Sequence, residues 1–124
     1  MKQFKPMDKP RLLVIEDDPD VQKLLTTVAS RRGVNVDHAS DGEEAITLLE
    51  RNRYDLVVLD LLLPKVNGFV VAEFVRGLDP RPRLIVFSAL SRYFAEQFPE
   101  AVILQKPDDL SRIEDILSGT APRA

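Results

Sequence analysis

Four stretches of this chain are apolar through their whole middle, and they constrain the fold more than any other feature. They read LLVI, LVVL, LIVF and AVIL, within residues 11–16, 55–60, 83–88 and 101–105. Strands are apolar on both faces where helices cover both faces of a parallel sheet. A fifth run, residues 34–38, alternates apolar and polar residues, which is typical of a half-exposed edge strand. The runs therefore predict the strands of a parallel sheet in an α/β domain.

Helical spacing fills the first stretch between these runs. Its apolar residues recur at i, i+3, i+4 and i+7, at Val21, Leu24, Leu25 and Val28. Asp18 is placed to cap this helix, with Pro19 at its first position and Gly33 where it stops.

Three further helices are predicted in the same way. Ser40 and Glu43 have capping-box spacing ahead of the second helix. Residues 79–82 (DPRP) end the third, and Gly119 ends the last. The apolar stripes are Ala45, Leu48 and Leu49; Val71, Phe74, Val75 and Leu78; and Leu110, Ile113 and Leu117. Helices that alternate with strands indicate a sheet with helices on both faces.

Composition fits one domain and excludes several classes of function. The chain has 124 residues, 44% hydrophobic and 30% charged, with a net charge of -3 that does not favour nucleic acid. It has no cysteine, which excludes disulfides, thiolate metal sites and a cysteine nucleophile. No apolar run reaches the roughly 20 residues of a membrane helix. The first six residues lack an apolar signal region, so we expect a cytoplasmic protein.

Polar groups follow the buried runs at one end. The carboxyl ends of the runs carry Glu16, Asp17 and Asp18, then Asp60, Ser88 and Lys106. Ligands of open parallel sheets bind beyond the carboxyl ends of the strands. We therefore expect these groups to converge on one pocket.

The residue types in this pocket suit phosphoryl transfer. Several carboxylates form the oxygen site that Mg²⁺ prefers. With a cation beside it, Asp60 can remain ionised and act as a nucleophile that forms an aspartyl phosphate. Ser88 can hydrogen-bond a phosphoryl oxygen, and Lys106 can pair with its charge. The set predicts phosphorylation of an aspartate.

The same residues resemble the receiver (CheY-like) domain of bacterial two-component response regulators. The matching motifs occur in the family's order from residue 12 to about residue 117. They are residues 14–18 (VIEDD), 55–60 (DLVVLD) with Pro64 and Gly68, 87–89 (FSA) and 106–107 (KP). The resemblance implies a flavodoxin-like (βα)5 fold, with a doubly wound parallel sheet of five strands in the order 2-1-3-4-5.

The resemblance also implies a role for each site residue. Asp60 would be the phosphoacceptor and a Mg²⁺ ligand. Asp17 would ligate Mg²⁺ directly, Glu16 largely through a water, and Leu62 through its backbone carbonyl. The remaining two residues follow the same pattern: Ser88 would be the switch hydroxyl, and Lys106 would pair with the phosphoryl group across a candidate cis bond to Pro107. The phosphoryl donor would be a histidine kinase or phosphotransfer protein, and the output an unidentified protein or a second copy of the chain.

Structural roles are predicted for the other residues near the motifs. We expect Asp18 to be a helix cap and not a metal ligand, because the family's acidic pair maps to Glu16 and Asp17. Pro64 and Gly68 are expected to shape the loop after the phosphoacceptor. The single histidine, His38, lies on the expected edge strand and is expected to be structural.

The chain departs from the family between Ser88 and Lys106. This stretch is about one helical turn short, so residues 90–98 should hold an abbreviated fourth helix that ends at Pro99. Ile103 stands where the family usually has the aromatic residue of its switch. Tyr93 and Phe94 could supply an aromatic contact instead, or pack on the core.

Leu62 and Leu90 stand at positions that flank the path of hydrolytic water in the family. Neither side chain can hold a water by hydrogen bonding. We therefore predict a slowly hydrolysed phosphoaspartate.

The domain is expected to span residues 11–118, between tails at residues 1–10 and 119–124. We expect a stand-alone receiver, with a fragment of a longer response regulator as the alternative. Three classes of function remain open: a phosphoaccepting switch that catalyses only its own phosphorylation and dephosphorylation, a binding module that signals without phosphorylation, and a phosphatase. The switch is the leading interpretation. A dehalogenase-type phosphatase would want an acid at the position of Leu62.

Overall fold

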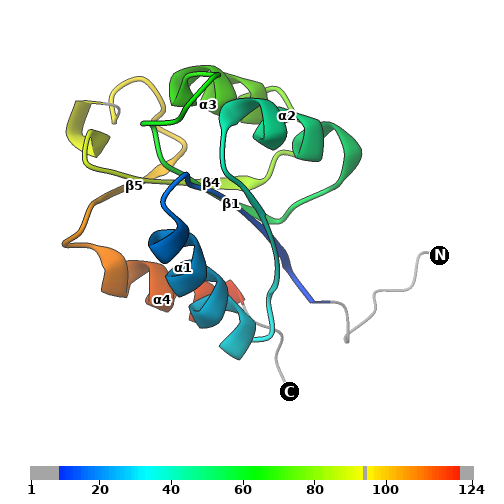
Figure 1. Ribbon diagram of the computed structural model, residues 1–124, viewed down its shortest axis with the longest axis vertical. Coiled ribbons are helices and arrows are strands. Elements are labelled where there is room, and N and C mark those ends of the chain that lie inside the picture. The colour runs from blue at the N-terminus through cyan, green and yellow to red at the C-terminus, as the bar shows by residue number, and fades with distance from the viewer. Residues whose placement is uncertain (1–8, 94, 121–124) are drawn as a thin grey trace.

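Five parallel strands form one sheet with helices on both sides in a computed structural model that describes residues 9–93 and 95–120 (Figure 1). The strands are β1 (Arg11–Ile15), β2 (Asn35–Ala39), β3 (Leu56–Leu59), β4 (Arg83–Ser88) and β5 (Val102–Gln105). Their order is β2-β1-β3-β4-β5, and every neighbouring pair is parallel. The predicted fold class and strand order are confirmed.

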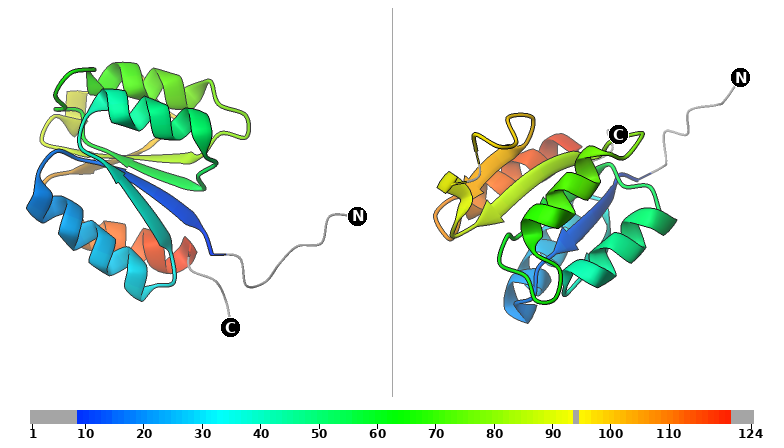
Figure 2. Two further views of the ribbon diagram at one scale, coloured as in Figure 1. Left: turned by 45° about the vertical axis from the view of Figure 1, so that its right-hand side comes forward. Right: turned by 90° about the horizontal axis from the view of Figure 1, so that it is seen from above.

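Two pairs of helices cover the sheet, as Figure 2 shows. They are α1 (Pro19–Arg31), α2 (Gly42–Arg51), α3 (Gly68–Arg76) and α4 (Leu110–Thr120), with a 3₁₀ turn, η1, at Ser91–Tyr93. Helices α1 and α4 lie on one face of the sheet, and α2 and α3 lie on the other. Strand residues alternate between these two layers, so that Leu12 packs with α1 and α4 whereas Leu13 packs with α2 and α3. This double coverage explains why the central strands are apolar throughout.

Both sheet edges match their sequence patterns. Strand β2 is exposed at Asn35 and His38 and buried at Ala39, as expected of an edge strand. Strand β5 forms the other edge, and Leu104 is its one fully buried residue.

Helix α1 begins and ends as predicted. The Asp18 carboxylate accepts a hydrogen bond from the Asp20 amide at 2.9 Å, which caps the helix, and Pro19 is its first residue. Gly33 follows the helix with φ at 76°, a conformation that glycine adopts without strain.

Two predicted helix boundaries are wrong. Asp41, not Ser40, caps α2: its carboxylate accepts from the Glu44 amide at 2.9 Å, while Glu44 accepts from the Ser40 amide at 2.7 Å. The capping box is therefore shifted by one residue from Ser40 and Glu43. Helix α4 continues past Gly119 to Thr120, because glycine in a helix costs only about 1 kcal/mol relative to alanine.

The stretch between β4 and β5 contains less helix than predicted. It contains only the η1 turn among the residues that the structure describes, in place of an abbreviated α-helix. Phe98 is 3% exposed and packs against the α2–α3 side of the core, and the Ala101 amide bonds to its carbonyl at 3.0 Å. Residues 98–101 therefore form the turn that leads into β5.

No helix within the described part of the chain is long and apolar enough to span a membrane.

Candidate phosphorylation site

The carboxyl ends of β1 and β3 bring three acidic side chains together. Glu16 and Asp17 follow β1, and Asp60 follows β3, its neighbour in the sheet. One carboxylate oxygen of each lies within 4.8 Å of the others. Glu16 and Asp60 are only 2% and 6% exposed, whereas Asp17 is exposed. The predicted convergence of these residues is present.

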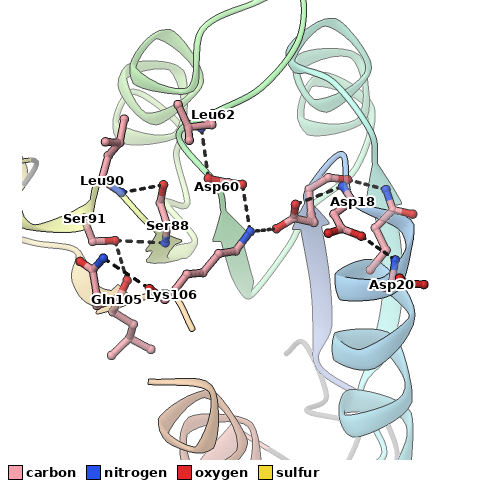
Figure 3. A network of polar contacts seen from close by, with 12 residues as sticks. Asp18, Asp20, Asp60, Leu62, Ser88, Leu90, Ser91, Gln105 and Lys106 are labelled. Carbon is pink, nitrogen blue, oxygen red and sulfur yellow. Dashed lines mark hydrogen bonds and ion pairs between the residues drawn. The ribbon is translucent and has the colours of Figure 1, made fainter. Parts of the chain in front are cut away.

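Lys106 lies between two of these carboxylates, as Figure 3 shows for its contact with Asp60. It follows β5, and its ammonium contacts Glu16 Oε1 at 2.5 Å and Asp60 Oδ2 at 3.0 Å. The Lys106–Pro107 peptide is cis, as the resemblance implied. The lysine thus joins residues that are 90 and 46 positions away in sequence.

The charges in this cluster do not balance. Three carboxylates face one ammonium, which leaves a surplus of two negative charges if all are ionised. Buried charge of one sign is costly unless a counter-charge compensates it. A divalent cation would supply that charge.

Burial and pairing shift the pKa values of this cluster. Burial raises the pKa of Glu16, although its hydrogen bond with Lys106 acts in the opposite direction. Burial alone would lower the pKa of Lys106, but hydrogen bonds with Glu16 and Asp60 outweigh it and raise this pKa. The lysine is therefore held firmly in its charged form beside a carboxylate that ionises less readily than usual.

The Glu16 side chain and backbone are both held by neighbouring groups. Its second carboxylate oxygen accepts from the Asp18 amide at 3.1 Å. The Gln22 side chain donates to the Glu16 carbonyl and also to Ser40 Oγ, at 3.0 Å for the serine. Gln22 was not singled out in the sequence, because a glutamine on the polar side of a helix carries no distinctive signal.

The loop after Asp60 is shaped by a close backbone approach. The Leu62 amide donates to Asp60 Oδ1 at 3.1 Å, which fixes one carboxylate oxygen. A Cβ atom on Gly68 would lie 2.5 Å from the Leu61 Cα, so only glycine fits where α3 begins. The Pro64 carbonyl accepts from the Gly42 amide at 3.4 Å, which ties the loop to α2. The expected loop-shaping role of Pro64 and Gly68 is consistent with these contacts.

Ser88 ends β4, the strand beside β3, and is fully buried. Its hydroxyl accepts from the Leu90 amide at 3.3 Å (Figure 3). Ser91, which the sequence analysis missed, accepts from the Ser88 amide at 3.1 Å and donates to the Leu104 carbonyl at 2.5 Å. Ser91 therefore ties the end of β4 to β5.

A comparison with protein families identifies this arrangement. The family described as the response regulator receiver domain matches residues 12–117. The chain belongs to this family. The acidic cluster, Ser88 and Lys106 lie at the strand ends where the sequence predicted them.

Relatives with assigned names are longer proteins. The receiver is 40% identical over 85 residues to a probable transcriptional regulator, ycf27, of Porphyridium aerugineum, covering 68% of this chain and 35% of the relative. It is 39% identical over 77 residues to the transcriptional regulatory protein AfsQ1 of Streptomyces coelicolor, covering 62% and 34%. The chain thus spans about a third of the length of the curated relatives it matches.

Solved receiver structures resemble the whole domain. The non-phosphorylated HemR receiver of Leptospira biflexa is 31% identical with a TM-score of 0.76, covering 94% of this chain and 100% of that one. TrrA of Thermotoga maritima, solved in complex with Mg²⁺-BeF, is 28% identical with a TM-score of 0.73, covering 86% and 96%.

Other residues singled out in the sequence lie outside the acidic cluster. Ile103 is partly buried against the α2–α3 side of the core. His38 is on β2, at the far side of β1 from Asp60. The predicted aromatic contact falls on Phe94 and on the Tyr93 side chain, which lie outside the described part of the structure.

Proposed function

We propose that this receiver is a phosphoaccepting switch in which Asp60 takes a phosphoryl group from a histidine kinase or phosphotransfer protein. One observation carries the proposal: the Lys106 ammonium bonds to the buried Asp60 carboxylate within a cluster that keeps surplus negative charge. Lys106 contacts only two of the three carboxylates, so its single charge leaves negative charge that a bound cation would compensate.

Each residue has a definite part in this transfer. A carboxylate oxygen of Asp60 forms a bond to phosphorus while the bond from phosphorus to the donor breaks, and the electron pair of that bond leaves with the donor. The Leu62 amide orients the other carboxylate oxygen through its 3.1 Å hydrogen bond. Lys106 pairs with the charge on the phosphoryl oxygens, and Ser88 turns its hydroxyl from the Leu90 amide toward one of them.

The acidic residues suit a Mg²⁺ ion. Glu16, Asp17 and Asp60 provide oxygen ligands within reach of one another, and the Leu62 carbonyl is a further candidate. When bound, Mg²⁺ neutralises the carboxylates and stabilises the charge on the transferring group. The Mg²⁺-BeF complex of the similar TrrA supports this choice of metal.

Intact mass spectrometry after incubation with acetyl phosphate tests the switch. We expect one added phosphoryl group that requires Mg²⁺ and is absent from Asp60→Asn. Asp55→Asn is the matched control, because Asp55 lies before β3, at the opposite end of that strand. Failure of the wild-type chain to gain mass with acetyl phosphate and with phosphoramidate would overturn the proposal.

We also propose that the phosphoaspartate is long-lived. Figure 3 shows the Leu62 side chain on the side of Asp60 away from the Lys106 ammonium, and Leu90 beside Ser88; neither side chain can hydrogen-bond a water. The phosphoaspartate of Leu62→Asn should be hydrolysed faster than that of wild type. Leu24→Asn is the control: it replaces an exposed leucine on α1 and should not change the rate of hydrolysis. Equal decay rates in Leu62→Asn and wild type would remove the role assigned to Leu62.

A second function has specific support. Two features favour a binding module that signals without phosphorylation: Ile103 in place of an aromatic residue, and only a 3₁₀ turn among the described residues between β4 and β5. Unchanged partner binding by Asp60→Asn and by phosphorylated wild type would support that alternative. The proposed switch catalyses only its own phosphorylation and dephosphorylation, since Leu62 stands where a phosphatase of the dehalogenase type would have an acid.

The receiver could function alone or as one domain of a longer regulator. Its relatives include a DNA-binding response regulator, MtrA of Mycolicibacterium smegmatis, of which the match covers 29%. We propose that the same switch serves either a stand-alone receiver or the receiver part of such a regulator.

A further inference from the structure

Lys106 reaches the phosphorylation site from the edge of the sheet. It follows β5, the edge strand, and its amide donates to the Ser88 carbonyl of β4 at 3.2 Å. Its ammonium contacts Asp60, after β3, and Glu16, after β1, which are the second and third strands inward from β5. A lysine side chain is long and flexible. The place of the ammonium therefore depends on how firmly the backbone at this edge is held.

Asp109 closes the turn that carries Lys106. The Asp109 carboxylate accepts from the Gln105 amide at 2.8 Å, and the Asp109 amide donates to the Gln105 carbonyl at 2.9 Å. These two bonds enclose residues 105–109 in one turn. An edge strand has backbone groups that need partners other than a neighbouring strand. At Gln105, Asp109 supplies a partner for both backbone groups.

A helix-capping role does not account for the Asp109 carboxylate. Asp109 directly precedes α4, and an aspartate at that position commonly accepts from an amide of the first helical turn. The carboxylate accepts instead from Gln105, four residues earlier in the chain. Its bond therefore supports the turn with Lys106 rather than the start of α4.

Gln105 is also held through its side chain. Its side-chain amide donates to the Ala89 carbonyl at 2.9 Å and to the Lys106 carbonyl at 3.4 Å (Figure 3). Ala89 follows Ser88, so Gln105 connects the loop after β4 with the turn after β5. Gln105 is thus a fixed support for Lys106, the residue next to it. Such support matters because misplacement of a reacting group by about 1 Å can slow a reaction about a hundredfold.

We propose that Asp109 is a positioning residue for phosphoryl transfer: through Gln105, it holds the Lys106 ammonium in place against Asp60 and Glu16. This role rests on the proposed function, in which Lys106 pairs with the charge of the phosphoryl group. Asp109 acts as a hydrogen-bond acceptor, so asparagine, whose side-chain oxygen also accepts, can replace it. Alanine cannot replace it, because it leaves the Gln105 amide without this acceptor.

The rate of phosphorylation at increasing acetyl phosphate concentration, with Mg²⁺ in excess, tests this role. We expect Asp109→Ala to lower the maximal rate about tenfold, since a displaced ammonium stabilises the transferring phosphoryl group less. Asp109→Asn should restore the rate to within about twofold of wild type. Asp108→Ala is the matched control, because Asp108 is an exposed aspartate next to Asp109 and also precedes α4.

A double-mutant cycle tests the link between Asp109 and Lys106 without phosphorylation. Urea unfolding without Mg²⁺ compares the loss of stability caused by Asp109→Ala in wild type and in Lys106→Met. If Asp109 acts through Lys106, the loss is smaller in Lys106→Met, because the ion pairs that Asp109 supports are already absent there. Asp108→Ala should cause the same loss in both backgrounds.

Three results would overturn the proposal. The first is a maximal rate in Asp109→Ala equal to that of Asp108→Ala, and the second is an equal loss of stability by Asp109→Ala in both backgrounds. The third is an Asp109→Asn variant as slow as Asp109→Ala, because the charge and not the hydrogen bond would then matter. A wild-type chain that gains no phosphoryl group would instead overturn the proposed function, and the double-mutant cycle would still decide whether Asp109 holds Lys106.

Discussion

Two ion-pair clusters at opposite ends of the sheet each centre on one cation that contacts two carboxylates, but only one of them is buried and includes a third carboxylate, Asp17. Lys106 bonds to Glu16 and Asp60, and Arg76 bonds to Glu73 and Glu100, so each has one cation between two carboxylates. In the first cluster, the side chain of Lys106 is 20% exposed, that of Glu16 3% and that of Asp60 7%. In the second cluster, the side chain of Arg76 is 37% exposed, that of Glu73 62% and that of Glu100 28%.

Burial decides what each cluster can do. Water screens the Arg76 cluster, so its ion pairs contribute little and its arginine serves mainly to position other groups. It donates to the Gln97 carbonyl at 2.9 Å and lies 4.3 Å from the centre of the Phe98 ring, which fixes the stretch that replaces a helix. The Lys106 cluster is costly to bury and is short of positive charge, which indicates that it serves chemistry rather than stability.

Removal of the buried cation should have the largest effect on stability. Lys106→Met leaves Glu16 and Asp60 without their counter-charge, and we expect a loss of about 3 kcal/mol in the free energy of unfolding. Urea unfolding without Mg²⁺ measures this, and added Mg²⁺ should restore part of the loss. Lys65→Met is the control, because Lys65 is 59% exposed and its pairs are 3.6 and 3.8 Å long. Equal effects of the two variants would contradict the distinction between buried and exposed clusters.

Substitution of the helix cap should have a moderate effect. Asp18→Ala removes the acceptor for the Asp20 amide and should lower the free energy of unfolding by about 1 kcal/mol. Asp18→Ser, which can also cap, should recover most of it. Neither variant should change the response to Mg²⁺, and a lost response in Asp18→Ser would make Asp18 a metal ligand.

Loss of the exposed cation should act locally. Arg76→Met frees Glu100 and the Gln97 carbonyl, so we expect faster hydrogen exchange of the amides at residues 97–101. The global unfolding midpoint should fall less than in Lys106→Met. Uniformly faster exchange across the sheet would show that Arg76 supports the whole fold.

Without Mg²⁺, the two clusters should each make a small contribution to the pH dependence of stability, and the two contributions should have opposite signs. Burial raises the pKa of Glu16, so the folded state gains protons there and stability falls as pH rises from 4.5 through the raised pKa. Hydrogen bonds from Arg76 lower the pKa of Glu100, so its contribution is present above 4.5 and is lost as pH falls through the lowered pKa. Glu16→Gln and Glu100→Gln should each remove one of these slopes. Slopes of the same sign would contradict the assignment.

The sequence predicts the buried cluster and not the exposed one, for a physical reason. Parallel strands end at one edge, so Glu16, Asp60 and Lys106 can be placed together once the runs are recognised as strands. Arg76 meets Glu100, 24 residues away, through a turn whose path has no periodic pattern. The same applies to Ser91, which the sequence does not distinguish from any serine of a turn.

Local ambiguity explains the shifted cap of α2. Ser40 and Asp41 are both capping residues, and each has a glutamate three positions later. Only the backbone geometry selects Asp41 and Glu44. Residues 90–98 were expected to form a short helix because the family has one there. Leu90, Tyr93, Phe94 and Phe98 have nearly helical spacing in the sequence, but the described residues of this stretch form only the η1 turn, which ends at Tyr93.

The thermal unfolding midpoint as a function of Mg²⁺ concentration tests most directly the claim that the buried cluster is built for a divalent cation. Binding to the folded state alone should stabilise wild type progressively, by about 2.7 kcal/mol at 100 times the dissociation constant. Asp17→Asn should respond much less, while Asp20→Asn, an exposed acid on α1, should respond like wild type. A wild-type midpoint that does not move with Mg²⁺ would contradict the account.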